Sequence, residues 1–251
     1  MKNYVVGDIH GSYKALLQAI ERSPFRPEED RLITIGDYLD GGWHIEIIPV
    51  IEYLNQLPNW IGLIGNHDSW MYDALNNSAM TANKHWLLHG AKQTLFTLGV
   101  QYVVFDELMY LRSYPPQIVS DFLDTLSLYF IDDDDNVFLH GGWKDPVQRI
   151  EDSDTVLNND LQDLYWDREL WRGASDRNEF PHNKVFVGHT SAMSNPEKRG
   201  NIWNLDSAAT HGGPVTIMEV ESEEYWQSDP VSELYDNFTL RSDTKPEGDT
   251  K

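Results

Sequence analysis

Five short apolar runs in this chain each lead to a glycine that stands beside Asp, Asn or His. The resulting motifs are Gly7-Asp8-Ile9-His10, Gly36-Asp37, Gly65-Asn66-His67, His140-Gly141 and Gly188-His189. Short apolar runs bounded by glycine predict buried strands. Open α/β sheets bind their ligands beyond the carboxyl ends of the strands. The pattern therefore favours a fold that brings several strand ends to one edge, where their polar side chains form a site.

Asp37 is the residue that we place at the centre of this site. Its carboxylate has two oxygens, so it can bridge two divalent ions. Asp8 and His10 lie two residues apart on an extended segment, where side chains point the same way, and can hold one ion together. Mixed oxygen and imidazole ligands suit Mn, Fe or Zn better than Ca or Mg, and the chain has no Cys for a thiolate site. A single Gly-Asp or His-Gly is usually an ordinary turn, but five such strand ends together predict a metal centre.

The series GDIHG, GDYLDGG, GNHD, HGG and GHT, in this order, resembles the motifs of the calcineurin-like metallophosphoesterases. Within that family it is most similar to the phosphoprotein phosphatase branch, which includes bacterial and phage enzymes. The resemblance implies an α/β fold, a β-sandwich of two mixed sheets flanked by helices, with two divalent metal ions at the carboxyl ends of the strands. The site residues that it implies are Asp8 and His10 for the first ion, Asp37 as the bridge, Asn66, His140 and His189 for the second ion, and His67 as general acid oriented by Asp40.

The chemistry of phosphoester hydrolysis agrees with these roles. Two ions polarise the phosphoryl oxygens and acidify a bridging water, and the resulting hydroxide attacks phosphorus in line. On an extended segment His67 points away from Asn66, so one residue can bind metal and phosphate while its neighbour faces the leaving oxygen. The Asp40 carboxylate would fix the tautomer of the imidazole and stabilise its protonated form, as proton donation to an alkoxide requires.

One position departs from the family pattern. Phosphoprotein phosphatases usually carry a phosphate-binding Arg after the second Asp of the GDYLDGG-type motif, where this chain has Gly41. The segment around Arg168 resembles a Trp-x-Arg segment of the bacterial branch whose Arg holds phosphate. We therefore expect Arg168 to bind the substrate phosphate, with Arg172 one helical turn further on as the alternative. The competing interpretation is that Arg168 forms a surface ion pair with Glu169 or Asp167.

The remaining pattern predicts how the strand ends are connected. Apolar residues at helical spacing over 12–20, and the segment 43–57, predict two βαβ units with parallel strands. The runs 201–206 and 215–220 are expected as strands of the second sheet. Between them, a turn resembling one near the family's active site carries His211, which we expect to face the substrate or, failing that, solvent.

A helical insertion is expected over about residues 68–128, as a cap beside the site. Trp70 and Trp86 in this insertion either line a substrate groove or belong to its core, and their helical spacing favours the core. Because the site residues come from both ends of the sequence, we expect one metallophosphoesterase domain over residues 1–242. Residues 243–251 are polar and are expected to be a disordered tail.

The net charge of −22, from 41 acidic and 19 basic residues, disfavours nucleic acid and anionic membranes as partners. It also repels phosphate, so metal ions and a few Arg side chains must dominate the field locally. The chain has no apolar stretch long enough to cross a membrane, and its first strand follows directly on Met1-Lys2-Asn3, so we expect a cytoplasmic location.

These observations predict a metal-dependent phosphatase, and the leading interpretation is a serine/threonine protein phosphatase that uses two ions, Mn²⁺ by preference and Fe or Zn as alternatives. Its substrate would be a phosphoprotein or a small phosphoester. A dinucleoside polyphosphate (diadenosine tetraphosphate) hydrolase is the first alternative, because Gly41 replaces Arg and adenine stacks on Trp or Tyr. A cyclic-nucleotide phosphodiesterase is another. A non-catalytic binding module that kept the fold is the alternative of a different class, and the complete set of ligands argues against it.

Overall fold

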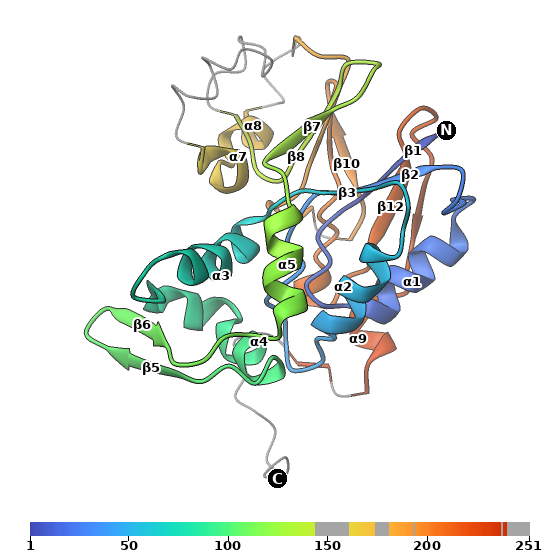
Figure 1. Cartoon of the computed structure of the whole chain (residues 1–251). Coiled ribbons are helices and arrows are strands. Elements are labelled where there is room, and N and C mark those ends of the chain that lie inside the picture. Colours follow the sequence, from blue (N-terminus) through green and yellow to red (C-terminus); the bar gives the residue numbers. More distant parts are fainter. Residues whose placement is uncertain (144–160, 174–180, 193, 237, 240–251) are drawn as a thin grey trace.

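The computed structural model describes residues 1–143, 161–173, 181–192, 194–236 and 238–239 (Figure 1). Its strands form three sheets. The first sheet contains β1 (Asn3–Val6), β2 (Arg31–Thr34), β3 (Trp60–Gly62), β12 (Thr216–Glu219) and β13 (Tyr225–Gln227). The second contains β7 (Tyr129–Ile131), β8 (Asn136–Leu139), β9 (Lys184–Val187), β10 (Glu197–Arg199) and β11 (Ile202–Asn204), and the third contains β4 (Thr81–Asn83), β5 (Tyr102–Phe105) and β6 (Leu108–Leu111).

The helices of the described residues lie between these strands in the sequence. The α-helices are α1 (Tyr13–Arg22), α2 (Ile47–Asn55), α3 (Asn66–Asn76), α4 (Ala91–Thr97), α5 (Gln117–Thr125), α7 (Asp163–Trp166), α8 (Glu169–Arg172) and α9 (Val231–Leu234). Two 3-10 helices are η1 (Lys84–His89) and η3 (Ala209–His211). No helix in the described part of the chain is both long and apolar enough to cross a lipid bilayer.

Both large sheets are mixed. The order of the first is β13-β12-β1-β2-β3, in which β1, β2 and β3 are parallel and β12 and β13 are antiparallel to their neighbours. The order of the second is β10-β11-β9-β8-β7, with β8, β9 and β11 parallel. Helices α1 and α2 connect the parallel strands of the first sheet, which confirms the two predicted βαβ units.

The two large sheets pack face to face, and alternation along their strands divides the core into layers. Val5 of β1 and Phe138 of β8 belong to the cluster between the sheets, where Phe138 stacks on Phe186 with ring centroids 5.0 Å apart. Tyr4, next to Val5, faces the cluster that contains α1 and α2. Val137, next to Phe138, faces the cluster that contains α7 and α8. The predicted fold, a β-sandwich of two mixed sheets flanked by helices, is confirmed.

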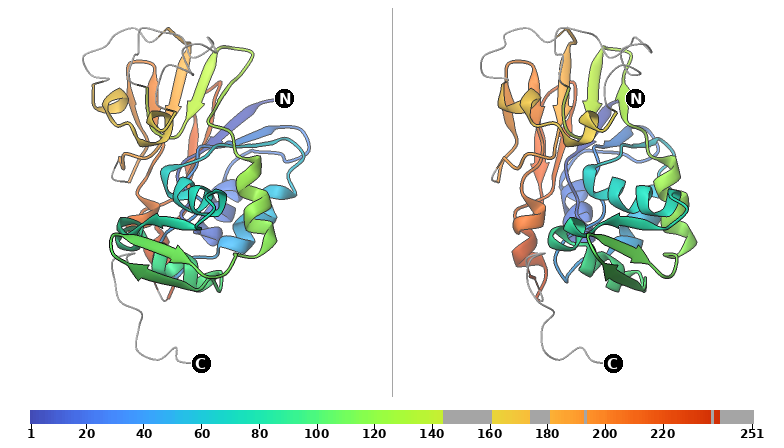
Figure 2. Two further views of the ribbon diagram at one scale, coloured as in Figure 1. Left: turned by 60° about the vertical axis from the view of Figure 1, so that its left-hand side comes forward. Right: turned by 90° about the vertical axis from the view of Figure 1, so that its left-hand side faces the viewer.

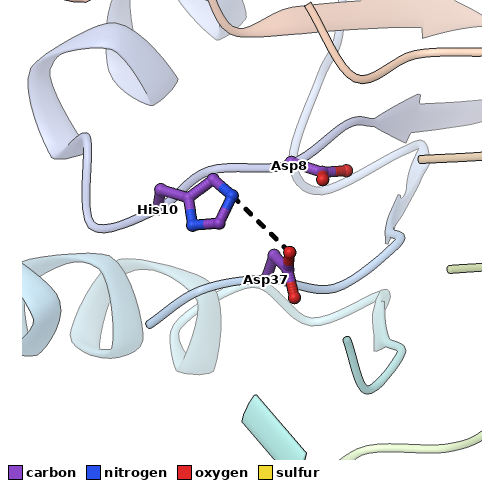
Figure 3. Close-up of side chains that lie close together, drawn as sticks. All are labelled: Asp8, His10 and Asp37. Carbon is purple, nitrogen blue, oxygen red and sulfur yellow. Dashed lines mark ion pairs between the residues drawn. The ribbon is translucent and has the colours of Figure 1, made fainter. Parts of the chain in front are cut away.

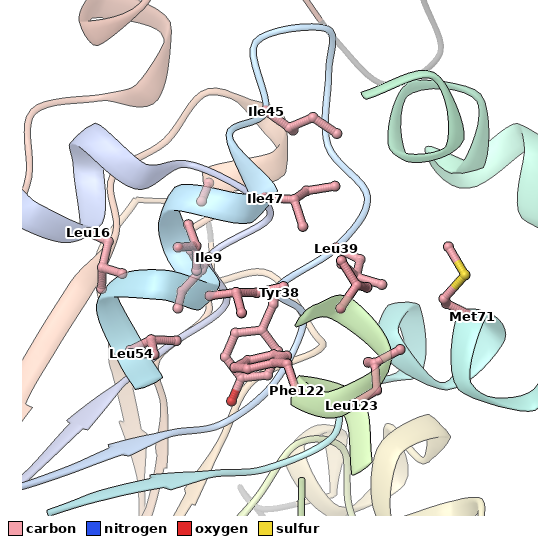
Figure 4. Packing of buried hydrophobic residues seen from close by; sticks show 14 of the residues in the cluster. Ile9, Leu16, Tyr38, Leu39, Ile45, Ile47, Leu54, Met71, Phe122 and Leu123 are labelled. Carbon is pink, nitrogen blue, oxygen red and sulfur yellow. The ribbon is translucent and has the colours of Figure 1, made fainter. Parts of the chain in front are cut away.

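The loop that carries Asp37 and Asp40 is anchored by the two residues between them. Tyr38 and Leu39 are fully buried, and Figure 4 shows both among the side chains of the largest apolar cluster. The Tyr38 ring meets the Phe122 ring of α5 edge-on, with centroids 4.9 Å apart, and its hydroxyl bonds with Thr34. The carboxylates on either side are therefore fixed by apolar packing beneath them.

Two expectations about the elements were wrong in part. The segment expected as a helical cap also contains the three-stranded sheet β4-β6-β5, which lies at the opposite end of the molecule from β7 and β8 (Figures 1 and 2). The run 215–220 forms β12, which pairs with β1 in the first sheet and not with the second sheet. Apolar alternation identifies a strand but does not select its partner. The expected tail, residues 243–251, lies outside the described residues.

Candidate metal centre

The five strand-end motifs meet in one place. Asp8 and His10 follow β1, Asp37 follows β2, Asn66 and His67 begin α3 after β3, His140 follows β8, and His189 follows β9; all seven side chains are buried. Asp8, His10 and Asp37 each offer one ligand atom, and these atoms lie within 4.8 Å of one another. Figure 3 shows the His10 ring turned toward the Asp37 carboxylate, with Asp8 beside them.

Four residues of this region have a left-handed backbone that non-glycine residues rarely adopt. The φ angles are 47° at His10, 55° at Asp37, 59° at Asp40 and 63° at His189. Asp and His tolerate this conformation better than most residues, yet each instance costs on the order of 1–3 kcal/mol. Such strain persists where the surrounding structure enforces it, and its concentration at the strand ends marks them as a built site.

The glycines of the motifs allow the carboxylates to approach neighbouring strand ends. A Cβ atom on Gly188 would collide with Oδ1 of Asp8, and one on Gly65 would collide with Oδ1 of Asp37. Glycine is therefore required at these positions by the close approach of an acidic side chain.

Each of the three candidate ligand histidines is oriented by a backbone carbonyl. His10 Nδ1 lies 3.0 Å from the carbonyl oxygen of Leu39, His140 Nδ1 lies 2.8 Å from that of Ile35, and His189 Nε2 lies 3.1 Å from that of Trp166. A carbonyl that accepts the N–H of one ring nitrogen leaves the other nitrogen as a lone-pair donor, which is the arrangement of metal-binding histidines.

The remaining nitrogens of two of these rings face Asp37 from opposite sides. His10 Nε2 is 3.5 Å from Oδ2 of Asp37, and His140 Nε2 is 3.3 Å from Oδ1. His140 Nε2 is also 3.0 Å from Oδ1 of Asn66. The centroids of the His140 and His189 rings are 5.2 Å apart. Asp37 thus lies between His10, an expected ligand of the first ion, and His140, an expected ligand of the second.

Charges in the centre perturb one another strongly. Burial and the Asp206 carboxylate raise the pKa of Asp8 well above its usual range, and burial raises the pKa of Asp206 to about 6. Burial would also raise the pKa of Asp37, but His140 and His67 hold it well below its usual range. Despite burial, Asp37 and Asp8 raise the pKa of His140 to about 10. The carboxylates of Asp8, Asp37 and Asp206 are all buried in this centre, and such a concentration of acidic groups favours the binding of a cation.

The residues present fit divalent ions. Oδ2 of Asp8 accepts a hydrogen bond from the backbone N–H of His189, while Oδ1 is buried and has no hydrogen-bond partner. A buried carboxylate oxygen without a partner is costly, and a cation would satisfy it. Oxygen and imidazole donors without thiolates suit Mn²⁺, Fe²⁺ or Zn²⁺. The first ion would be held by Asp8, His10 and Asp37.

His67 stands beside the cluster and is held by Asp40. The expectation that Asn66 and His67 lie on an extended segment was wrong, because both belong to the first turn of α3. His67 Nδ1 lies 2.9 Å from Oδ2 of Asp40, which is fully buried. Two side chains that the motifs did not indicate complete the support of this carboxylate: Thr94 Oγ1 donates to Oδ1 at 2.6 Å, and Trp86 Nε1 donates to Oδ2 at 2.5 Å. Trp86 is fully buried, which confirms the core interpretation for this residue.

Asp68, the last residue of the GNHD motif, fixes the backbone of the neighbouring loop. Its carboxylate accepts hydrogen bonds from the backbone N–H groups of Asp37, Tyr38, Leu39 and Gly65, at 2.8 to 3.1 Å. Asp68 belongs to the GNHD motif, but the sequence pattern predicted no role for it. In the structure, it joins the end of β2 to the start of α3.

A small pocket of about 150 Å³ opens onto the cluster. Its lining includes the expected residues Asp8, His10, Asp37, Asn66, His67 and His189, together with Arg168, Ser191, Asp206, Thr210 and His211. Asp206 was not among the predicted site residues, although it follows the strand β11 and is therefore a sixth strand end that carries an acid. His211, which was expected to face the substrate or solvent, lines the pocket and is exposed.

Arg168 is the only Lys or Arg among the described residues that line this pocket. It is half-buried, and it forms no ion pair with any residue that the structure describes. Arg172 instead lies 3.7 Å from Glu169 on the surface, and the Asp167 carboxylate accepts the backbone N–H of Leu170. The competing surface ion pair is thus made by Arg172 and not by Arg168.

Comparisons with known proteins agree with this geometry. The calcineurin-like phosphoesterase family matches residues 1–233. Serine/threonine-protein phosphatase 1 of Salmonella typhimurium is 24% identical over 224 residues, covering 87% of this chain and 91% of that protein. A symmetrical bis(5'-nucleosyl)-tetraphosphatase of Pseudomonas putida is 25% identical, covering 98% of each chain. The crystal structure of a putative diadenosine tetraphosphatase superposes with a TM-score of 0.58 at 19% identity, covering 90% of this chain and 92% of that one. The family match spans nearly the whole sequence, and the chain belongs to the calcineurin-like phosphoesterases.

Proposed function

We propose that this phosphoesterase is a serine/threonine protein phosphatase that uses two divalent ions, Mn²⁺ by preference. The observation that carries the proposal is the composition of the pocket of about 150 Å³: among the described residues that line it, Arg168 is the one Lys or Arg, and it lies beside the metal cluster and His67. Sites for whole small molecules usually measure about 300–1,000 Å³. A pocket of this size and charge suits one phosphoryl group, as in a phosphomonoester, better than a polyphosphate chain.

The residues divide the work of hydrolysis between them. Divalent ions, when bound, polarise the phosphoryl oxygens and acidify water. Asp8, His10 and Asp37 would hold one ion, and Asp37, Asn66, His140 and His189 the other. Arg168 would pair with the phosphoryl oxygens, which a planar guanidinium does well, and the Asn66 amide would assist it.

His67 would donate the proton that the leaving oxygen needs. Its Nδ1 is engaged by Asp40, so Nε2 is the nitrogen left to carry that proton. The Asp40 carboxylate would fix the orientation of the ring. A serine or threonine alkoxide is a poor leaving group, so a positioned acid matters most for these substrates.

A symmetrical dinucleoside tetraphosphatase is the second candidate function, and one observation favours it. Trp166 is 37% exposed, and its ring lies beside that of His189 with centroids 6.0 Å apart, so it offers a surface on which a base could stack. The full-length similarity to the Pseudomonas putida tetraphosphatase points the same way.

Parallel assays distinguish the two functions. The purified protein is analysed for metal, loaded with Mn²⁺, and given a phosphoserine peptide, diadenosine tetraphosphate and a cyclic nucleotide under the same conditions. About two ions per chain and a phosphopeptide kcat/KM well above the other two would support the proposal. Negligible phosphopeptide turnover beside rapid cleavage of diadenosine tetraphosphate would replace it with the second candidate. Full metal loading without any turnover would revive the binding-module alternative.

A further inference from the structure

A second, larger cavity adjoins the catalytic pocket. Its volume is about 690 Å³, and it lies among three loops: the one after β9, the one between β11 and β12, and the one after β13. Ser191 and His211 line both this cavity and the catalytic pocket, so the two lie side by side. The catalytic pocket has room for little more than a phosphoryl group. The remainder of a larger substrate must lie outside it, and this groove, which we call the loop groove, begins at its edge.

The lining of the loop groove indicates what kind of chemistry it accepts. The described residues that line it include no Lys, Arg, Asp or Glu, and His211 supplies the one ring apart from proline. A second nucleotide would need cations for its phosphates and an aromatic face for its base. The described lining offers neither, so this part of the groove is poorly suited to a dinucleoside polyphosphate.

The same lining suits a polypeptide. Ser191 and Asn195 are exposed, and their side chains make no hydrogen bond to any residue that the structure describes. Hydroxyl and amide groups both donate and accept, which matches the alternating N–H and C=O groups of an extended peptide. Pro214 and Pro230 add apolar walls that have no backbone N–H to satisfy.

We propose that the loop groove binds the uncharged polypeptide segment that flanks the phosphorylated residue of the substrate. This inference rests on the proposed protein phosphatase function and adds the surface by which a phosphoprotein is selected over a small phosphoester. The groove contributes to binding and takes no part in the chemistry at phosphorus, so its occupancy should lower KM without changing kcat.

The test compares two substrates with the same leaving group, a neutral phosphoserine peptide and N-acetyl phosphoserine amide, on the Mn²⁺-loaded full chain. Asn195→Trp fills the groove from an exposed position. Asn55→Trp, at the exposed end of α2, makes the same substitution far from the groove and is the matched control. Because both substrates release a serine alkoxide, the ratio of their kcat/KM values reports only the contribution of the flanking peptide.

The wild type should prefer the peptide, and Asn195→Trp should lower the ratio about tenfold through KM, which corresponds to about 1.4 kcal/mol of binding. Asn55→Trp should leave the ratio within about twofold of the wild type. A ratio that Asn195→Trp does not change would overturn the inference while leaving the phosphatase activity intact. A selective loss of diadenosine tetraphosphate cleavage in Asn195→Trp would assign the groove to a nucleotide instead. A wild type that hydrolyses neither phosphoserine compound would overturn the proposed function itself, and the groove assignment with it.

Discussion

Trp86 Nε1 donates a hydrogen bond to Oδ2 of Asp40, the same carboxylate oxygen that lies 2.9 Å from Nδ1 of His67. Trp86 belongs to η1, in the insertion that follows α3, and is fully buried. The insertion therefore supplies part of the polar environment that orients the candidate general acid. Thr94, from α4 in the same insertion, holds the other oxygen of Asp40.

Replacing Trp86 tests this link. In Trp86→Phe an aromatic ring remains but the indole N–H is lost. Asp40 then keeps its contacts with His67 and Thr94 and loses one hydrogen-bond donor. We expect kcat for a phosphoserine peptide to fall about tenfold, since a hydrogen bond to a charged group is worth about 1.5–3 kcal/mol and only part of it acts on His67. Trp226→Phe, in β13 and packed near Tyr4, is the control and should retain wild-type kcat. Equal kcat values in the two variants would show that the hydrogen bond from Trp86 does not contribute to proton donation by His67.

Replacing His67 separates proton donation from metal binding. His67→Asn should retain both ions, because none of the proposed ligand atoms is removed. Turnover should fall by roughly 10²–10⁴-fold for alkyl phosphates, which need a general acid, and least for p-nitrophenyl phosphate, which has a good leaving group. Elemental analysis and kcat on the two substrates provide the measurement. An unchanged rate on the alkyl phosphate would rule out the general-acid role.

Asp37 should behave differently, because both ions are expected to depend on it. Asp37→Asn removes a charge and one good oxygen ligand, and it disturbs the acceptor of the His67 backbone N–H. We expect metal content and activity to be lost together, with activity recovering in part at high Mn²⁺. Asp73→Asn, on α3 and away from the pocket lining, is the matched control. Full metal content in Asp37→Asn would place the bridge elsewhere.

Arg168 and Arg172 form a natural pair for testing phosphate recognition. Arg168 lines the pocket, while Arg172 lies on the surface beside Glu169. Arg168→Lys keeps the charge but loses the planar fork that matches phosphate, and kcat/KM should fall about 10²-fold, as for the loss of one preorganised donor. Arg172→Lys should stay within about twofold of the wild type, because an exposed ion pair contributes little. The reverse order of effects would assign phosphate binding to Arg172.

The residues of the candidate metal centre were largely predictable because each lies in a short sequence motif. Each proposed ligand sits in a short motif at a strand end, and in the structure the neighbouring glycines Gly65 and Gly188 allow a carboxylate to approach closely. Parallel βαβ units then force those ends to one edge. Asp206 could have been found by the same rule, since it lies two residues beyond the end of β11.

The support of the centre was not predictable in the same way. Trp86 and Thr94 reach Asp40 from positions 46 and 54 residues away, inside an insertion whose fold has no motif to fix it. The sheet β4-β6-β5 was missed because its strands are short and lie among helical patterns. The placement of β12 beside β1 depends on packing between distant segments, which alternation along one strand does not encode.

His44 provides a test of how the C-terminal segment is held, independent of the metal centre. Its ring lies 5.0 Å from that of Tyr235 and 5.1 Å from that of Phe238, and burial lowers the pKa of His44 to about 4. The unfolded chain takes up a proton at this residue near pH 6.5, while the folded chain does so only near pH 4. Stability from this residue is therefore complete above pH 6.5 and declines as the pH falls toward 4.

From about pH 7 to about pH 5, this difference should cost the wild type about 2 kcal/mol of unfolding free energy. His44→Gln cannot take up the proton, so its unfolding free energy should fall by about 2 kcal/mol less over the same interval, whatever its stability at neutral pH. Urea unfolding of both proteins at the two pH values measures the difference, and the acidic residues common to both cancel. Parallel losses in the two proteins would show that the His44 ring is solvated in the folded state, and that Tyr235 and Phe238 do not shield it.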